Sequence, residues 1–207
     1  MATACYTTGV RTAQPSAADT RLRRILERSA RLICQRGFEA TSMQEIAVAC
    51  GLTKAGLYHH VKTKDALLLA IMHYGMDLFE ELVLEQVAGI ANPLERLRAT
   101  MARNIGLVTN DASKEVTIIL HEHQTLTGDA LREINSRKKK YVAFLEASFR
   151  EASEQQLIRA IDPTLAAFSL LGTVLWTYKW YRADGRIPPA QLSDGMIDLF
   201  FAGLLPR

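Results

Sequence analysis

The sequence has few cysteines and no long hydrophobic run. Its three cysteines, Cys5, Cys34 and Cys50, are odd in number and lack paired spacing, which favours reduced thiols over a disulfide framework and gives no zinc knuckle. No apolar run reaches the roughly 20 residues that a bilayer-spanning helix needs, and no apolar stretch follows a basic start. We therefore expect a cytoplasmic protein with neither a signal peptide nor a membrane span.

Catalytic motifs are also absent. No nucleophile stands beside a base, and neither a phosphate-binding loop nor a pair of carboxylates stands out, so nothing nominates an enzyme and we expect no catalytic residue. The formal net charge of +3 is small, so nucleic-acid binding has to be argued from where the basic residues lie. They gather near the N-terminus, at Arg21, Arg23, Arg24, Arg28, Arg31 and Arg36.

Hydrophobic residues make up 48% of the 207 residues, which is enough to bury a sizeable core. No strand-like alternation of useful length and no internal repeat is present, so the sequence predicts an all-α fold. Residues 1–18 lack periodicity and are rich in Thr, Ala, Gly and Ser, which is typical of a flexible N-terminal arm. About nine helices are predicted after it, at 19–36, 43–50, 54–60, 64–88, 93–109, 113–126, 127–156, 163–180 and a last one running through Leu192 to Leu204.

Residues 41–64 contain the signals of two short helices joined by a tight turn. Ser42 and Glu45 stand at capping-box spacing and begin the first helix, Gly51 ends it, and Thr53 can cap the second. The second helix carries a lysine, a glycine, a tyrosine and two histidines in place of an apolar stripe, so it is suited to lie against a polar surface. This arrangement is typical of a helix-turn-helix, whose second helix enters the major groove of DNA.

The side chains of this segment divide into two groups by position. Those that begin the second helix can meet base edges, and those that follow supply hydroxyl, imidazole and ammonium donors to phosphates. A purely structural helix pair with a charged surface is the alternative interpretation. The base-edge candidates are Thr53, Lys54, Ala55 and Gly56, and the phosphate candidates are Tyr58, His60, Lys62 and Lys64, with His59 as a further DNA-contacting candidate.

The same stretch resembles a known family. From about Arg24 to Met72 the chain is similar to the N-terminal DNA-binding domain of the TetR family of bacterial transcriptional regulators. His59 and Val61 depart from the aromatic residues often found there. The matching positions are Gly37-Phe38, Thr41-Ser42, Ile46-Ala47, Gly51-Leu52, Thr53-Lys54, Leu57-Tyr58, His60, Lys62, Lys64-Asp65 and Leu67.

This resemblance implies a two-part chain and a regulatory function. It implies a helix-turn-helix domain at 19–63 and a ligand-binding and dimerisation domain at 64–207. The last two helices would form a homodimer, which would bind a palindromic operator as a ligand-responsive repressor associated with the bacterial nucleoid. Thr41 or Ser42, at the head of the helix that precedes the turn, would bind a phosphate with the help of the unpaired backbone donors there.

The arginines of the first helix admit two interpretations. Leu22, Ile25 and Leu26 recur at helical spacing, which leaves the arginines on the other side. That side is either a solvated face or a set of phosphate contacts, with Arg21 and Arg24 as the first candidates.

Histidines and a basic run mark the middle of the chain. His121 and His123 point about 200° apart on a helix, so they cannot chelate one ion together, and we expect no metal; one of them can still face a pocket. The run from Arg137 to Lys140 is by default a solvated face. At least one of its members must nevertheless point toward the inner side marked by Tyr141, where it could meet an anionic ligand.

Aromatic residues are concentrated between Trp176 and Arg182, which is typical of a core or an interface. We expect a dimer interface there, shared with the last helix. The run through Gly185-Arg186 also resembles the C-terminal helix of TetR regulators that sense acyl-CoA thioesters in fatty-acid or sterol degradation. An acyl-CoA is therefore one candidate effector, and a generic hydrophobic effector of an efflux or stress operon is the alternative. The predicted ligand-binding residues are Arg103, Asn104, His121, His123, Arg137, Lys138, Tyr141, Trp176 and Tyr178.

Overall fold

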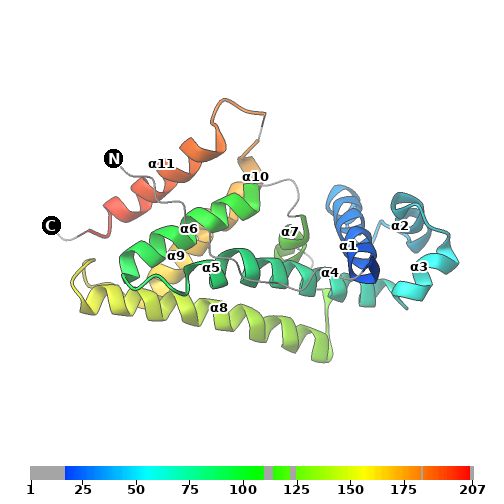
Figure 1. The fold of residues 1–207 in the computed structure, drawn as a ribbon, viewed down its shortest axis with the longest axis horizontal. Coiled ribbons are helices and arrows are strands. Elements are labelled where there is room, and N and C mark those ends of the chain that lie inside the picture. Colours follow the sequence, from blue (N-terminus) through cyan, green and yellow to red (C-terminus); the bar gives the residue numbers. More distant parts are fainter. Residues whose placement is uncertain (1–16, 110–113, 122–124, 183, 206–207) are drawn as a thin grey trace.

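The structure is a computed structural model that describes residues 17–109, 114–121, 125–182 and 184–205. The described residues form helices and connecting turns without a strand, so the predicted all-α class is confirmed (Figure 1). Residues 1–16 of the predicted arm lie outside the described part. The helices are α1 (Ala17–Arg36), α2 (Met43–Cys50), α3 (Lys54–His60), α4 (Lys64–Phe79), α5 (Glu85–Val87), α6 (Pro93–Thr109), α7 (Lys114–His121), α8 (Gly128–Glu154), α9 (Pro163–Leu175), α10 (Thr177–Trp180) and α11 (Pro189–Ala202).

Side-chain caps fix where several helices begin. Thr63 accepts a hydrogen bond from the Ala66 amide at 3.0 Å, and Asp162 accepts one from the Leu165 amide at 2.8 Å. Each cap satisfies an amide that has no partner within its own helix. The first helix differs from the predicted range of 19–36, because it already begins at Ala17.

The predicted helix of residues 64–88 is continuous but not uniform. Between α4 and α5 the chain forms a π-helical segment, η1 (Glu80–Leu84). Phe79, Val83 and Val87 are all buried at intervals of four residues. In an ideal α-helix that spacing drifts around the axis, and the wider π turns compensate for the drift.

Two hydrophobic clusters lie at opposite ends of the molecule (Figure 1). The C-terminal cluster joins α6, α8, α9 and α11 with Phe79 and Val83. The N-terminal cluster joins α1, α2, α3 and α4, and it also contains Ile118 and Ile119 of α7 and Ile134 of α8. The boundary at residue 63 therefore stays a prediction, since hydrophobic contacts of the N-terminal cluster extend well beyond it.

No helix in the described part of the chain is both long enough and apolar enough to cross a bilayer. The long α4–α5 segment and α8 instead run side by side along the molecule and connect its two ends (Figure 1).

Candidate DNA-binding interface and effector domain

Helix α3 is attached to the rest of the protein through one side. Leu57 is fully buried in the N-terminal cluster, and Val61, just after α3, is buried beside it. Lys54, Ala55 and His59 are exposed on the remaining surface. In Figure 1, α3 lies at the end of the molecule farthest from α11. The outer face of α3 is therefore free to enter a groove.

The turn before α3 holds it at a fixed angle to α2. Gly51 has a φ of 69°, in the left-handed region that glycine adopts without strain. The Leu52 amide donates to the Ala47 carbonyl at 2.8 Å, which closes the end of α2. Thr53 then accepts from the Gly56 amide at 3.0 Å and caps α3. The predicted helix-turn-helix is thus present with its expected caps.

The start of α2 is closed by a reciprocal cap. Ser42 accepts from the Glu45 amide, and the Glu45 carboxylate accepts from the Ser42 amide at 2.8 Å. That backbone hydrogen bond is the main reason why the pKa of Glu45 lies below its usual value. Thr41 is buried and donates to the Gly37 carbonyl at 2.7 Å, whereas Ser42 is exposed. Of the two residues, only Ser42 has an exposed side chain, and its hydroxyl also donates to the Glu45 carboxylate at 2.8 Å.

Lysines at the end of the motif are held by neighbouring groups. The Lys64 ammonium lies 4.3 Å from the centre of the Phe38 ring and donates to the Glu39 carbonyl at 3.3 Å. Lys62 donates to the Tyr58 carbonyl at 3.4 Å. Such contacts restrict long, flexible side chains before binding, which lowers the entropy lost when a phosphate is bound.

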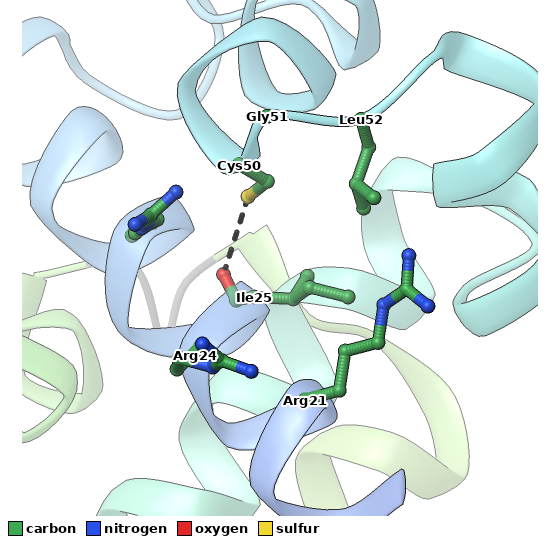
Figure 2. A pocket seen from close by; sticks show the side chains of 7 residues that line it. Arg21, Arg24, Ile25, Cys50, Gly51 and Leu52 are labelled. Carbon is green, nitrogen blue, oxygen red and sulfur yellow. Dashed lines mark hydrogen bonds between the residues drawn. The ribbon is translucent and has the colours of Figure 1, made fainter.

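An arginine-lined notch of about 170 Å³ separates α1 from the turn between α2 and α3 (Figure 2). Arg21, Arg24 and Arg28 line it, and Cys50 at its floor donates a weak hydrogen bond to the Ile25 carbonyl at 3.7 Å. Burial raises the pKa of the Cys50 thiol, so that floor is uncharged. No ion pair is recorded for these three arginines among the described residues, which leaves their charge available to an anion.

Arg28 was not among the predicted site residues. Its spacing from Arg24 and Arg21 places the three side chains on one face of α1, and this periodicity could have indicated it. Its guanidinium also lies 3.4 Å from the Ala49 carbonyl, so α1 is tied to the end of α2 beside the turn.

Family comparisons agree with this geometry. Residues 25–71 match the family described as "Bacterial regulatory proteins, tetR family", and residues 91–204 match "Tetracyclin repressor-like, C-terminal domain". The chain belongs to the TetR family. The resemblance found in the sequence is confirmed and extends over the C-terminal part.

Solved structures of TetR regulators share most of this chain. One is described as "AibR in complex with isovaleryl coenzyme A and operator DNA"; it is 64% identical, with 86% of this chain and 97% of that chain covered at a TM-score of 0.83. Apo AibR is 60% identical over 90% of this chain and 99% of that chain, with a TM-score of 0.82. The repressor KstR2 of Rhodococcus jostii (strain RHA1) is 27% identical over 201 residues, 92% of this chain and 96% of its own length.

The second TetR domain contains a buried polar pair. Asn104 donates to the Tyr141 hydroxyl at 2.6 Å and to the Thr100 carbonyl at 2.9 Å. Tyr141 packs edge-on against Phe79 with ring centres 4.3 Å apart, and burial raises the pKa of its hydroxyl. Asn104 and Tyr141, both predicted ligand-binding residues, are therefore brought together in the C-terminal cluster of this TetR protein.

Basic candidates of the TetR effector domain lie farther out. Arg137 bridges Asp77 at 2.7 Å and Glu80 at 3.1 Å, so its charge is compensated by α4 and η1. Lys138 is half-buried, burial lowers its pKa, and it donates to the Ile119 carbonyl at 3.1 Å. The exposed Arg103 lies 3.4 Å from the Leu82 carbonyl.

The remaining ligand-binding candidates are dispersed. Trp176 is 64% exposed, and Tyr178 is half-buried in α10. His121 ends α7, and its side chain lies outside the described part, as does the whole of His123. No group of potential metal ligands is found among the described residues of this TetR chain. The roles of all these residues stay predictions.

Proposed function

We propose that the protein is a homodimeric repressor that binds a palindromic operator and is released by a short-chain acyl-CoA, with isovaleryl-CoA as the first candidate. The observation that carries the proposal is the likeness, over 86% of the chain, to AibR bound to isovaleryl coenzyme A and operator DNA. The protein acts by binding alone, without catalysis, in the bacterial nucleoid. The alternative is a generic hydrophobic effector of an efflux or stress operon.

DNA recognition belongs to α3 and its neighbours. Thr53, Lys54, Ala55 and Gly56 begin the helix and meet base edges, because the groove admits the N-terminal end of a recognition helix. Phosphate contacts flank it on both sides and are supported by the exposed Ser42 and by the basic notch of α1. The phosphate group consists of Arg21, Arg24, Ser42, Tyr58, His59, His60, Lys62 and Lys64, whereas the predicted contact of Thr41 is left out because its side chain is buried.

The dimer forms through α9, α10 and α11. One side of α9 is buried at Ala166, Leu170 and Val174, but Leu165 and Phe168 are exposed by 60% and 56% on the other. Trp176 continues this apolar stripe, and Leu199 adds to it from α11 with 82% exposed. Pairing of two such faces would bury them and hold two recognition helices about 34 to 36 Å apart, or a multiple of that distance.

The two parts of the effector would bind at different places, the acyl group in the C-terminal cluster and the phosphates on the basic part of α8. Its acyl group would enter beside Asn104 and Tyr141, where the amide and hydroxyl can orient a thioester carbonyl. Its phosphates would meet Lys139 and Lys140, which are exposed, while Arg137 is already paired with carboxylates. Arg103 and Tyr178 are candidates for the mouth of the same site, whereas Trp176 is assigned to the dimer face.

Release requires that the effector bind two conformers unequally. An acyl group wedged in the C-terminal cluster would displace Phe79 and Val83, which belong to that cluster, and thereby tilt α4. Because α4 begins directly after the helix-turn-helix, its tilt separates the two copies of α3. Couplings of this kind amount to about 1 to 3 kcal/mol.

The test is selection of bound fragments from random duplex DNA, followed by titration of the selected operator by fluorescence anisotropy. We expect a palindrome bound by a dimer, and release by isovaleryl-CoA but not by free coenzyme A or by isovalerate. Absence of a preferred sequence would contradict the DNA-binding proposal. Operator binding that no acyl-CoA weakens would leave a repressor and refute only the effector class.

A further inference from the structure

Helix α7 lies between the two ends of the molecule but shares the hydrophobic core of the DNA-binding end. It contacts both α1 and α4 (Figure 1). Ile118 and Ile119 are 1% and 5% exposed, and both belong to the N-terminal cluster, whereas Val116 of the same helix belongs to the C-terminal one. We call the contact of α7 with α1 and α4 the α7 seam.

The seam is closed most tightly at Gly75 of α4. A Cβ at this position would lie 2.8 Å from Ile119 Cδ1 and 3.0 Å from the carbonyl group of Glu115. The second neighbour is backbone, so any side chain here would push α7 away from α4. The two helices meet at this point almost backbone to backbone, and a glycine is what allows it.

A buried carboxyl group lies in the same seam. Glu115 is 1% exposed, and its Oε2 has no hydrogen-bond partner among the described residues. An unpaired buried polar atom destabilises a fold, because it gives up its hydrogen bonds to water and gains none in return. A side chain so costly to the fold requires an explanation other than packing.

Charged and titratable groups surround this carboxyl from both neighbouring helices. Burial is the main cause that raises the pKa of Glu115, and the negative charge of Glu27 on α1 adds to it. Arg31 on α1 and Lys114 on α7 act in the opposite direction. From α4, Tyr74 donates to Glu27 at 3.2 Å, and burial followed by that carboxylate raises the pKa of Tyr74 to about 12.

Helix α8 contacts α7 at Ile119, which is itself a residue of the seam. Lys138 of α8 donates to the Ile119 carbonyl at 3.1 Å, three residues along α8 from Tyr141 of the buried polar pair. Thus α8 and α4 both contact α7 at Ile119.

We propose that Glu115 is a positioning residue of the α7 seam, whose charge sets how closely α7 packs against α1 and α4 and thereby how strongly effector binding is coupled to α3. The inference rests on the proposed function, since it concerns how effector binding reaches α3. Protonated Glu115 can remain buried beside Glu27 without charge repulsion, and the seam is then closed. Ionised Glu115 is repelled by Glu27 and desolvated, and the seam loosens.

The experiment measures the ratio of operator affinities without and with isovaleryl-CoA, by anisotropy at pH values from 5.5 to 8.5, in the full-length protein. For the wild type, we expect the ratio to fall as pH rises, from a value within the range of about 5-fold to 150-fold that such couplings span. Glu115→Gln keeps the shape of the side chain without the charge, so its ratio should stay high and independent of pH. The exposed Glu154→Gln serves as control and should follow the wild type.

Gly75→Ala provides a second variant that opens the seam by steric contact. It should bind the operator but lose most of the effector response, while Gly106→Ala, where a Cβ meets nothing within 4 Å, should retain it. Wild-type and Glu115→Gln profiles that coincide over the whole pH range would overturn the proposal, as would an unchanged response in a folded Gly75→Ala protein. A wild type that does not bind its operator, or does not respond to any acyl-CoA, would instead refute the proposed function.

Discussion

The two hydrophobic clusters of this protein differ in what surrounds them. The N-terminal cluster lies under short helices whose starts are fixed by Ser42, Thr53 and Thr63, and its outer surface is polar. The C-terminal cluster holds the buried Asn104–Tyr141 pair and is covered by a helix with an exposed apolar stripe. The first arrangement presents a rigid surface to a large partner, and the second provides a core that a small molecule can enter and a face that a second copy can cover.

The largest expected effect is on the rigid surface. Gly56→Leu would place a side chain against Thr53 Oγ1, which lies only 3.2 Å from a Cβ at this position, and would hold α3 off the groove. Operator affinity should fall by about 1000-fold or more, to the level of non-specific binding, in an anisotropy titration. The control is Gly106→Leu, whose position is open. Retained operator binding by Gly56→Leu would show that the start of α3 is not at the bases.

Removal of a core side chain at the other end should lower the stability of the fold and should affect operator affinity less. Phe149 is fully buried in the C-terminal cluster, and Phe149→Ala should lower the free energy of unfolding by about 3 to 5 kcal/mol. Urea denaturation followed by circular dichroism measures this loss. Val48→Ala, at a side chain that is 67% exposed, should change it little. Equal losses in the two variants would mean that Phe149 is not part of the core.

The polar pair should matter to the effector and not to the operator. Tyr141→Phe removes the acceptor of the Asn104 hydrogen bond at a cost of about 1 to 3 kcal/mol in unfolding free energy. We expect a weaker response to isovaleryl-CoA and an unchanged operator affinity without effector, both measured by anisotropy. Tyr181→Phe loses a hydrogen bond to the Ile187 carbonyl at the periphery and should leave the response intact. If both variants respond normally, the pair lies outside the effector site.

Stability itself should depend on pH through the α7 seam. The pKa of Glu115 is raised above its ordinary value in the folded state, so the folded state holds the proton more tightly than the unfolded state. Stability from this group is complete below the ordinary value and is lost as pH rises through the folded one. Thermal denaturation should therefore show Glu115→Gln gaining on the wild type as pH increases from 5 to 8. A constant difference between the two proteins would exclude this linkage.

The smallest effect concerns a single phosphate contact. Lys64→Ala should weaken binding to every duplex sequence alike and reduce the slope of log affinity against log salt by about one unit. Titrations at several salt concentrations, on the operator and on an unrelated duplex, measure both quantities. Lys54→Ala, at a base-edge candidate, should instead reduce the preference for the operator. A loss confined to the operator in Lys64→Ala would contradict a phosphate role.

The sequence predicted the DNA-binding end better than the effector end, for a physical reason. Caps such as Ser42 with Glu45 act between residues three apart, so their signals lie within one short stretch. The pairing of Arg137 with Asp77 joins residues 60 positions apart, and nothing near Arg137 indicates it. The π turns at Glu80–Leu84 likewise depend on how buried residues meet the C-terminal cluster.

Helix α7 is the clearest example of this limit. Its extent was predicted as 113–126 and is observed as Lys114–His121, yet no local pattern could assign Ile118 and Ile119 to the N-terminal cluster. That assignment depends on the close approach at Gly75, some 40 residues earlier in the chain. The single helix predicted at 163–180 is interrupted in the structure, where α9 ends at Leu175 and a short α10 follows.

With the dimer interface proposed for α9, its apolar stripe would also make the amount of protein a variable of regulation. A protomer on its own leaves Leu165, Phe168 and Trp176 in water, at a cost that grows with each square ångström of apolar surface. Below the concentration at which two copies associate, operator occupancy would rise with the square of the protomer concentration. A fall in the concentration of the protein would then relieve repression steeply, as an effector does.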